Sequence, residues 1–488
     1  MLDPSNVPAV ILSLLVTGAI ATYYLSSRNR VYGEHLVTVI TLVVLGLALF
    51  LIPPISRGET VESAYSFLSL PLAVSFRVDA LSLYMGLLIA FLWALAARYS
   101  RGYMSHSHAR PRYYAFLLLA QATNLGVVFA ADLVGFLLFF ELMAITSYFL
   151  VAHEEDDYAL FAGNKYIYMS IAGGLGLFFS LLITYHLVGK TAFGQGPLIS
   201  EPSLLATAAF FGFLVSFGIK IGMFPLHVWL PDAHPAAPAP VSALLSGIMI
   251  KIGAYGLFRA FFDVFGIELI REMGLQNITL TLAVITILLG SALALLQDDL
   301  KRRLAYSSIA QIGYILLGLS LLTDRALTGA VFHIFTHAMM KGCLFMCAGA
   351  IIVQTGKRKI SDMKGIGLKM PVTMICFTLA TLSMVGIPPF NGFISKLQLA
   401  MGALDAGEPV YVFLLIFSSM LNAAYYFPIV IAAFFATPKE EAGLKLEAGL
   451  VMMVPIGILA AMTFLLALGP YNWPLQSARL ISKSFIGL

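Results

Sequence analysis

The sequence predicts an all-α polytopic membrane protein with about fourteen transmembrane helices. Of its 488 residues, 60% are hydrophobic and only 11% are charged, whereas soluble domains are about half apolar and about a quarter charged. The apolar residues stand in long continuous runs, whereas a transmembrane β-barrel would show alternation. A soluble globular protein is therefore excluded. The net charge of +4 is small for this length and gives no reason to expect a nucleic-acid partner.

Each predicted helix is a run of roughly 20 mostly apolar residues, the length that crosses a bilayer. The runs begin near Val7, Leu36, Val78, Tyr114, Leu133, Tyr166, Ser203, Pro240, Asn277, Ala305, Ala326, Val372, Val410 and Gly449. The loops between them are short, so we expect a single transmembrane domain over residues 1–488 without a soluble catalytic domain. There is no glycine-rich phosphate loop and no cysteine spacing for haem or an iron–sulfur cluster, so we expect neither a cofactor nor a metal in this chain.

Several of these runs have informative boundaries. The first has no Lys or Arg before Arg28, so it lacks the basic start of a signal peptide and is interpreted as helix 1. The fourth and fifth runs are nearly continuous and meet near Asp132. The seventh ends in the proline-containing stretch 224–235, and the twelfth is interrupted by prolines within 386–392. Because such irregular backbone in a membrane must be surrounded by protein or water, helices 7 and 12 are predicted to be broken.

The basic residues predict the topology. Most of the 29 Lys and Arg residues lie in odd-numbered loops, for example within 98–112, 301–303 and 357–369. Positive charge marks the cytoplasmic side, so we expect both termini on the outer face of a prokaryotic cell membrane. The scarcity of Asn and Gln is also typical of a thermophile.

Four lysines remain inside apolar runs, namely Lys220, Lys251, Lys341 and Lys396. A charge at the centre of a spanning helix costs about 2.5–3.5 kcal/mol even on a lenient scale, so each lysine needs water or a partner inside the bundle. Lys251 lies too deep in its run to snorkel easily, whereas Lys220 lies near the far end of its run and could snorkel. A structural role is the alternative for Lys341, and Lys396 follows a disrupted helix rather than a loop. Glu141 is the one carboxylate clearly in the middle of a run, and we expect it to pair with a lysine.

A histidine stripe adds further titratable groups. His333, His337 and Lys341 are spaced by four residues and therefore share one helix face. Two histidines at this spacing can bind zinc, but a third ligand and the glutamate of the metalloprotease motif are absent. Histidine and desolvated lysine can both change charge near neutral pH, so the stripe predicts a proton relay, with a structural hydrogen-bonding role left open.

Secondary candidates stand at the helix breaks and helix starts. They are His227, Asp232 and His234 in the first break, and Asp79 and Asp132 at helix starts, where a capping role is at least as well supported.

Taken together, these motifs resemble the antiporter-like proton-translocating membrane subunits. The similar segments are 220–251, Phe-Phe-Glu141, 299–314, the His333 to Lys341 stripe, and 386–396. This family includes membrane-arm subunits of complex I, the D-type subunit of Mrp Na+/H+ antiporters, and relatives in membrane-bound hydrogenases. Lys396 stands where one complex I subunit has Glu, and the chain is too short for the lateral helix of the largest one. A D-type Mrp subunit, a hydrogenase relative and the smallest antiporter-like complex I subunit remain.

The resemblance implies two inverted five-helix repeats, helices 4–8 (114–262) and helices 9–13 (277–434). Helices 1–3 (7–113) precede the repeats and a C-terminal helix (447–488) follows them. Carried over by position, Glu141 and Lys220 form the ion pair of the first half-channel, and Lys251 is the central relay. His333, His337 and Lys341 follow, and Lys396 gates the second half-channel.

The resemblance also implies partners: other membrane subunits, lipid, H+ with or without Na+, and, in a redox-driven complex, a soluble iron–sulfur module. The chain itself shows no redox active site, so its enzyme class stays open. Two alternatives to a proton-translocating subunit remain, a non-conducting membrane anchor of a redox complex and a stand-alone secondary transporter.

Overall fold

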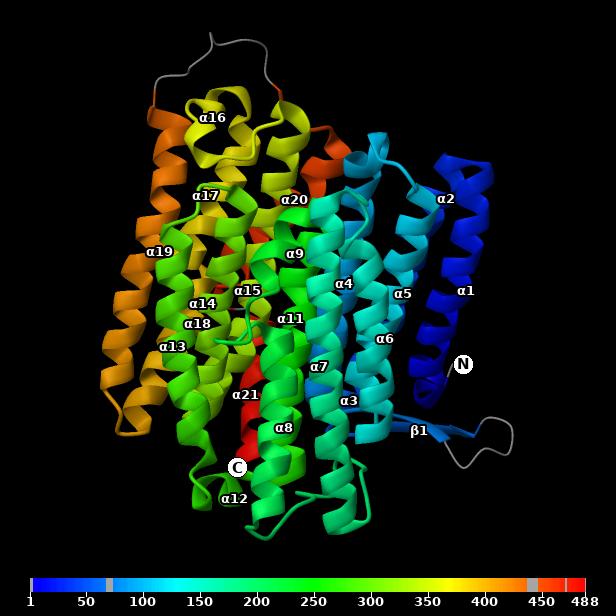
Figure 1. The fold of residues 1–488 in the computed structure, drawn as a ribbon, viewed down its shortest axis with the longest axis vertical. Helices are drawn as coiled ribbons and strands as arrows, with labels where there is room; N and C mark the ends of the chain where they lie inside the picture. Colours follow the sequence, from blue (N-terminus) through cyan, green and yellow to red (C-terminus); the bar gives the residue numbers. More distant parts are fainter. Residues whose placement is uncertain (1–2, 67–72, 437–445, 470–471, 488) are drawn as a thin grey trace. The chain divides into compact units, whose positions relative to one another are not determined.

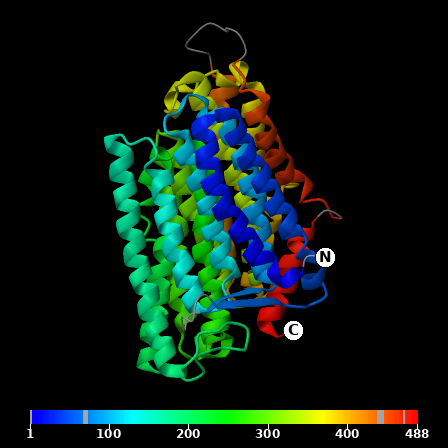
Figure 2. The same ribbon diagram turned by 90° about the vertical axis from the view of Figure 1, so that its right-hand side faces the viewer.

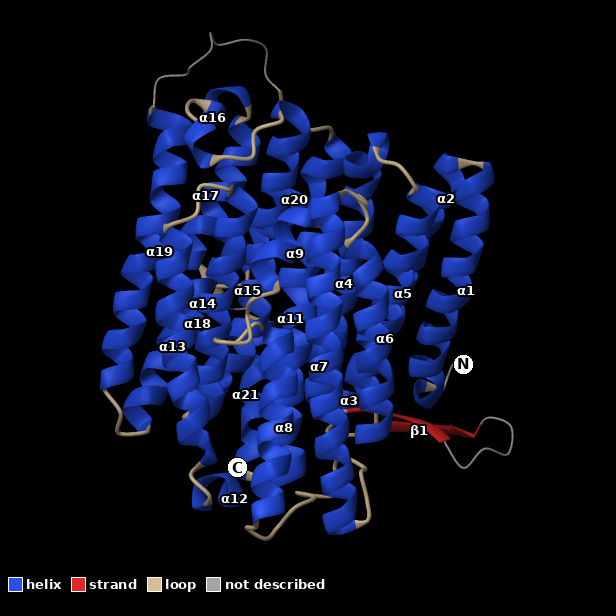
Figure 3. Ribbon diagram, viewed as in Figure 1, coloured by secondary structure: helices blue, strands red, loops and turns tan. Residues whose placement is uncertain are grey.

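The computed structural model describes residues 3–66, 73–436, 446–469 and 472–487. Nearly all of their regular structure is helical, as Figures 1 and 3 show. The chain divides into two compact units. Unit 1 comprises Met1–Ala97, Ser107–Ile221 and Ile252–Gly274, and unit 2 comprises Arg98–His106, Gly222–Lys251 and Leu275–Leu488.

Unit 1 is a bundle of packed helices. Its elements are α1 (Val7–Arg28), α2 (Arg30–Leu49), α3 (Ile52–Ser56), most of α4 (Ala80–Tyr103), α5 (Arg110–Phe129), α6 (Leu133–Val151), α7 (Asp157–Val188), α8 (Leu204–Ile221), most of α11 (Ile250–Arg259) and α12 (Ile267–Glu272). Helix α5 packs on α1 and α6, and α7 packs on α6 and α8 (Figure 2). A Cβ on Gly176 of α7 would lie 3.1 Å from the carbonyl oxygen of Gly212 on α8. The two backbones come this close because neither residue has a side chain.

A β-hairpin precedes α4, a feature that the all-α expectation missed. Strands β1 (Val61–Ser66) and β2 (Ala73–Val78) pair antiparallel, with Val61 opposite Val78. The valines are buried, and the next pair, Glu62 and Arg77, forms an ion pair. This alternation of buried and charged pairs is what a half-buried strand requires.

Unit 2 is organised around α15 (Asp324–Thr355), a helix that is buried along most of its length. The other elements are α9 (Leu230–Ala236), α10 (Ala239–Leu244), α13 (Leu275–Leu295), α14 (Leu300–Ser320), α16 (Ile366–Lys369), α17 (Pro371–Val385), α18 (Asn391–Asp405), α19 (Val410–Phe435), α20 (Leu450–Leu465) and α21 (Trp473–Ile486). Helices α10, α14, α17, α18, α20 and α21 all pack against α15. Two short π-helical turns, Leu245–Met249 and Ala260–Phe265, flank α11 and make 239–265 continuous.

Both predicted helix breaks are confirmed. Helix α8 ends at Ile221 and is followed by a turn with a cis Phe224–Pro225 bond before α9 begins. Helix α17 ends at Val385, and α18 begins only after a cis Pro388–Pro389 bond. The prolines stop the helical ladder, as expected from their missing N–H groups.

The C-terminal segment 447–488, which is predicted to hold a helix, contains two helices in its described residues. Helix α20 ends at Leu465 and α21 begins at Trp473. The end of α20 lies beside the break in α17–α18, where the Asn391 side chain donates to the Met462 carbonyl at 3.3 Å. Helix α21 then follows α15, with Trp473 against Phe335 and Ser482 bonded to Asp324.

Among the described residues, ten helices are long and apolar enough to cross a membrane. The other predicted runs coincide with α5 and α14, which are less apolar, and with α17 and α20, which are shorter. The structure is thus that of a polytopic helical membrane protein. The count of fourteen crossings stays a prediction.

Candidate functional site

Lys220 lies at the last turn of α8 and its side chain is nearly enclosed, at 3% exposure. Its Nζ donates a hydrogen bond to the hydroxyl of Tyr166 on α7 at 2.9 Å. The same Nζ lies 5.2 Å from the centroid of the Tyr166 ring and 5.6 Å from that of Phe140. The ammonium is therefore stabilised by the Tyr166 hydroxyl and by the aromatic rings of Tyr166 and Phe140, all of which are neutral.

Glu141 comes from α6 and is half-buried beside the same cluster. Its carboxylate occupies space left by Gly174 of α7, where an added Cβ would overlap Oε1. Oε1 is buried without a hydrogen-bond partner among the described residues. Glu141 and Lys220 interact electrostatically, but no ion pair within 4.0 Å joins these two described residues. The predicted direct pair is therefore not formed, because Lys220 donates to Tyr166 instead.

Lys251 is completely buried near the start of α11. Its Nζ donates to the carbonyl oxygen of Ser246, which lies in the π-helical turn before α11. The Ser246 hydroxyl is 2.7 Å from that of Ser308 on α14. The backbone hydrogen bonds of a π-helical turn span five residues instead of four, so the pairing of carbonyls changes and the Ser246 carbonyl oxygen can accept from Lys251.

The histidine stripe lies on one face of α15, as predicted. The rings of His333 and His337 stack with centroids 5.7 Å apart. His333 Nδ1 lies 2.9 Å from the Ser395 hydroxyl, and Nε2 lies 3.1 Å from Oε1 of Gln311. Both ring nitrogens of His337 are buried without a hydrogen-bond partner in the described part of the chain. His337 interacts electrostatically with Lys251, Lys341 and His333.

Lys341 continues the stripe and is also fully buried. Its Nζ donates to the Leu304 carbonyl at 2.8 Å, to the Ser307 hydroxyl, and to the Tyr426 hydroxyl at 3.1 Å. All three acceptors are neutral, and they come from α14 and α19.

Lys396 donates hydrogen bonds to carbonyl groups at the second helix break. Its Nζ donates to the carbonyl oxygens of Met384 and Val385, both at 2.9 Å, and to the Ser419 hydroxyl at 3.0 Å. The two carbonyls belong to the last turn of α17, where the break leaves them without helical partners and the helix dipole is negative. Lys396 and Gly386 also line a cavity of about 510 Å³.

The secondary candidates mostly have structural partners. Asp132 caps α6 by accepting from the Gly135 N–H at 2.7 Å. Asp79 precedes α4 and forms a 2.7 Å ion pair with Arg259, while Asp232 pairs with Arg302 at 3.4 Å. The ring of His227 stacks on Phe224, and the fully buried His234 stacks on Phe345 and interacts electrostatically with Lys301, Lys341 and Lys251.

Two further cations are buried that are not among the predicted site residues. Lys301 is predicted to lie in a cytoplasmic loop, but it lies in the first turn of α14 and donates to the carbonyls of Pro235 and Ala237. Arg259 is buried between Asp79 and Asp263. The spacing Lys251, Tyr255, Arg259 could have revealed it, because it repeats the four-residue interval of the histidine stripe.

The described residues contain no group of three His, Cys, Asp or Glu side chains placed to hold a metal ion. Lysines, histidines, tyrosines and serines dominate the buried polar network instead. Such groups can hold, accept and donate protons.

Broken helices and buried cations inside an apolar bundle define a polytopic membrane protein with ionisable groups in its interior. Residues 130–422 match the family described as NADH:quinone oxidoreductase/Mrp antiporter, transmembrane. Residues 65–114 match the NADH-ubiquinone oxidoreductase (complex I), chain 5 N-terminus. The chain therefore belongs to the family of antiporter-like membrane subunits shared by NADH:quinone oxidoreductase and Mrp antiporters.

Particular relatives fall in several branches of this family. The chain is 33% identical to NADH-quinone oxidoreductase subunit N of Desulforudis audaxviator, over 93% of this chain and 94% of that protein. It is 32% identical to hydrogenase-4 component B of Escherichia coli, over 84% of this chain and 65% of that protein. Its fold is similar to a chain of the Mrp complex from Dietzia sp., with a TM-score of 0.88, 22% identity, and coverage of 99% of this chain and 98% of that one.

Proposed function

We propose that this chain is a proton-translocating subunit of a multisubunit membrane complex. The observation that carries the proposal is the set of partners around the four buried lysines. Each ammonium is held by carbonyls, hydroxyls or aromatic rings, and no ion pair joins any of them to a carboxylate in the described residues. A lysine locked to a carboxylate stays charged, whereas a desolvated lysine with neutral partners can exist as ammonium or amine. A proton carrier must visit both states.

In unit 1, Glu141 controls how firmly Lys220 holds its proton. The two groups interact electrostatically without direct contact, so a small approach of the carboxylate strengthens the attraction and a small retreat weakens it. Coulomb energy inside a protein changes by kilocalories over a few ångströms, enough to move a proton. Tyr166 gives the released proton an adjacent hydroxyl.

In unit 2, the proton passes along a series of buried polar groups. The series begins at Lys251 and continues to His337 and His333 on α15; Lys251 and His333 both act electrostatically on His337. From His333 the proton passes to α18 through the Ser395 hydroxyl, which lies within hydrogen-bond distance of the imidazole. Lys396, which acts electrostatically on His333, completes the path at the second break.

The complex is either an Mrp-type antiporter or the ion-translocating part of a redox-driven complex, and other membrane subunits are its partners in both. The names of the similar proteins, an NADH-quinone oxidoreductase subunit and a hydrogenase-4 component, support the redox-driven form. The similarity to a chain of an Mrp complex supports the antiporter form. Mass spectrometry with iron analysis of the complex, extracted through a tag on this chain, separates them. Soluble iron–sulfur subunits indicate the redox-driven form, whereas small iron-free membrane subunits indicate Na+/H+ exchange.

The proposed function is tested by transport in membrane vesicles that contain the complex. We expect Lys220→Met and Glu141→Gln to abolish proton translocation while the complex assembles normally. Lys190→Met, which changes an exposed loop lysine, is the matched control and should leave transport unchanged. Undiminished transport in both site variants would contradict the mechanism. Failure of assembly in both would instead support a structural anchor.

We also propose that both termini face the outer side of the cell membrane. The three native cysteines are buried, so single cysteines introduced by Asp3→Cys or Gly487→Cys report on each terminus separately. A maleimide that cannot cross the membrane should label both variants in intact cells. Labelling only after the cells are opened would reverse the proposed orientation.

A further inference from the structure

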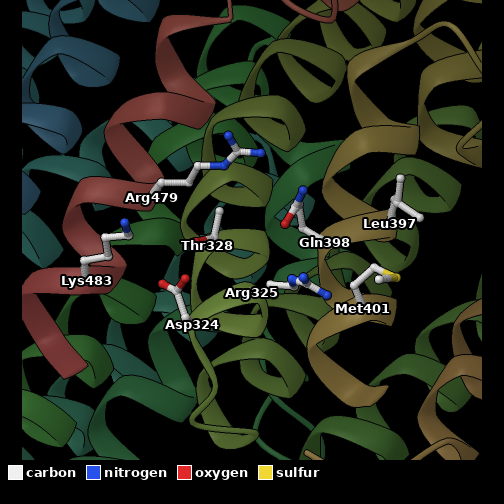
Figure 4. A pocket seen from close by; sticks show the side chains of 8 residues that line it. All are labelled: Asp324, Arg325, Thr328, Leu397, Gln398, Met401, Arg479 and Lys483. Atoms are coloured by element: carbon white, nitrogen blue, oxygen red, sulfur yellow. The ribbon is translucent and has the colours of Figure 1, made fainter. Parts of the chain in front are cut away.

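A cavity of about 420 Å³ lies where α15 begins, beside α18 and α21. Figure 4 shows its lining, with Arg479 and Lys483 on α21 and Arg325 on α15. Asp324 is the one acidic residue among the lining side chains. Leu397 and Met401 of α18 form an apolar wall. Three basic side chains against one carboxylate make this a cation-rich cavity.

The positive charges are only partly balanced. Arg325 pairs with Asp405 at 3.4 Å, and Asp324 accepts a hydrogen bond from the Ser482 hydroxyl at 2.7 Å. Arg479 and Lys483 form no ion pair or hydrogen bond within the described residues. They stand four residues apart on one helix, an arrangement in which like charges repel. An anion in the cavity would relieve that repulsion.

The surroundings indicate which kind of anion. Leu404, near the end of α18, and Leu480, in the middle of α21, are 51% and 67% exposed. In a membrane protein, such exposed apolar side chains contact acyl chains. Basic residues near the ends of spanning segments attract the phosphates of anionic lipids. A free phosphate ion would gain nothing from the apolar wall, whereas a phospholipid uses both the cations and the wall.

We propose that this cavity binds the phosphate group of an anionic phospholipid. Arg479 and Lys483 contact the phosphate, and one acyl chain packs along Leu397 and Met401. The bound lipid joins α21 to α18 across the cavity and thereby stabilises the last helix of the chain. This site is independent of the proton path, and none of its lining residues belongs to the proposed relay.

The test is native mass spectrometry of the detergent-purified full chain, titrated with phosphatidylglycerol or phosphatidylcholine. We expect preferential binding of phosphatidylglycerol, weakened at least tenfold in the double variant Arg479→Gln, Lys483→Gln. The control Arg28→Gln, Lys190→Gln removes the same charge from exposed positions and should bind like the wild type. Circular dichroism of each variant without added lipid confirms that the chain is folded.

Two results would overturn the proposal. One is equal affinity for phosphatidylglycerol in the wild type and the folded Arg479/Lys483 double variant. The other is displacement of the lipid by millimolar inorganic phosphate, which would assign the cavity to a soluble anion.

Discussion

His153 lies in the turn between α6 and α7, outside the spanning helices, and is completely buried. Its Nε2 is 3.2 Å from the Ser107 hydroxyl, and its ring stacks on His108 at 5.1 Å. Burial lowers the pKa of His153 from 6.5 to about 4, and the charges of Arg112 and His108 act in the same direction, opposed by Glu155. The folded protein therefore keeps this imidazole neutral at pH values where the unfolded chain protonates it.

The stability change follows from the two pKa values. Because the unfolded state binds the proton more tightly, stability falls as the pH drops below 6.5 and stops falling near pH 4. The difference between 6.5 and about 4 corresponds to about 3 kcal/mol in total. Roughly 2 kcal/mol of this is lost by pH 5.

The assay is denaturant unfolding of the purified full chain in detergent at pH 7.5 and pH 5. His153→Gln cannot take up the proton, so we expect the free energy of unfolding to fall by about 2 kcal/mol less than in the wild type. His186→Gln changes an exposed histidine and should behave like the wild type. Equal pH dependence in the wild type and His153→Gln would show that His153 does not lower the stability at pH 5.

Two further predictions concern unit 1. Gly174→Ala should reduce proton translocation severely, because its Cβ would displace the carboxylate of Glu141. The control Gly46→Ala, whose Cβ meets open space, should leave translocation unchanged. Transport assays in vesicles check both variants. Asp79→Asn should destabilise the chain at pH 7 by about 2 kcal/mol. Burial raises the Asp79 pKa, but the charge of Arg259 and the hydrogen bonds from Arg259 and Ser82 together outweigh burial and lower this pKa from 3.8 to about 2. This difference is present above pH 3.8 and should shrink as the pH falls toward 2, so denaturant unfolding at pH 7 and pH 3 checks it.

The features that backbone chemistry dictates could be predicted from the sequence. Proline within 224–235 and 386–392 must interrupt a helix wherever it falls, and both breaks occur. The spacing of His333 and His337 requires a shared helix face, and their rings stack. Long apolar runs indicated the helices because a spanning segment has no other way to satisfy its backbone.

Features that depend on contacts between distant helices could not be predicted. Nothing near Lys220 in the sequence shows that its direct partner is Tyr166 and not the expected Glu141. Lys301 follows a helix-capping aspartate in a cluster of basic residues, and only the carbonyls at the end of α9 explain why it is buried. The end of α20 at Leu465 is equally hidden, because residues 449–468 are as apolar as an uninterrupted span.

If buried lysines carry protons and do not merely supply charge, Lys396 is the position at which the two roles are separated most directly. Arginine keeps the positive charge but cannot release its proton, and the cavity of about 510 Å³ beside Lys396 has room for a guanidinium. The measurement is proton translocation by vesicles that contain the assembled complex with Lys396→Arg. We expect translocation to be abolished in a normally assembled complex. Wild-type translocation with arginine at this position would contradict this expectation.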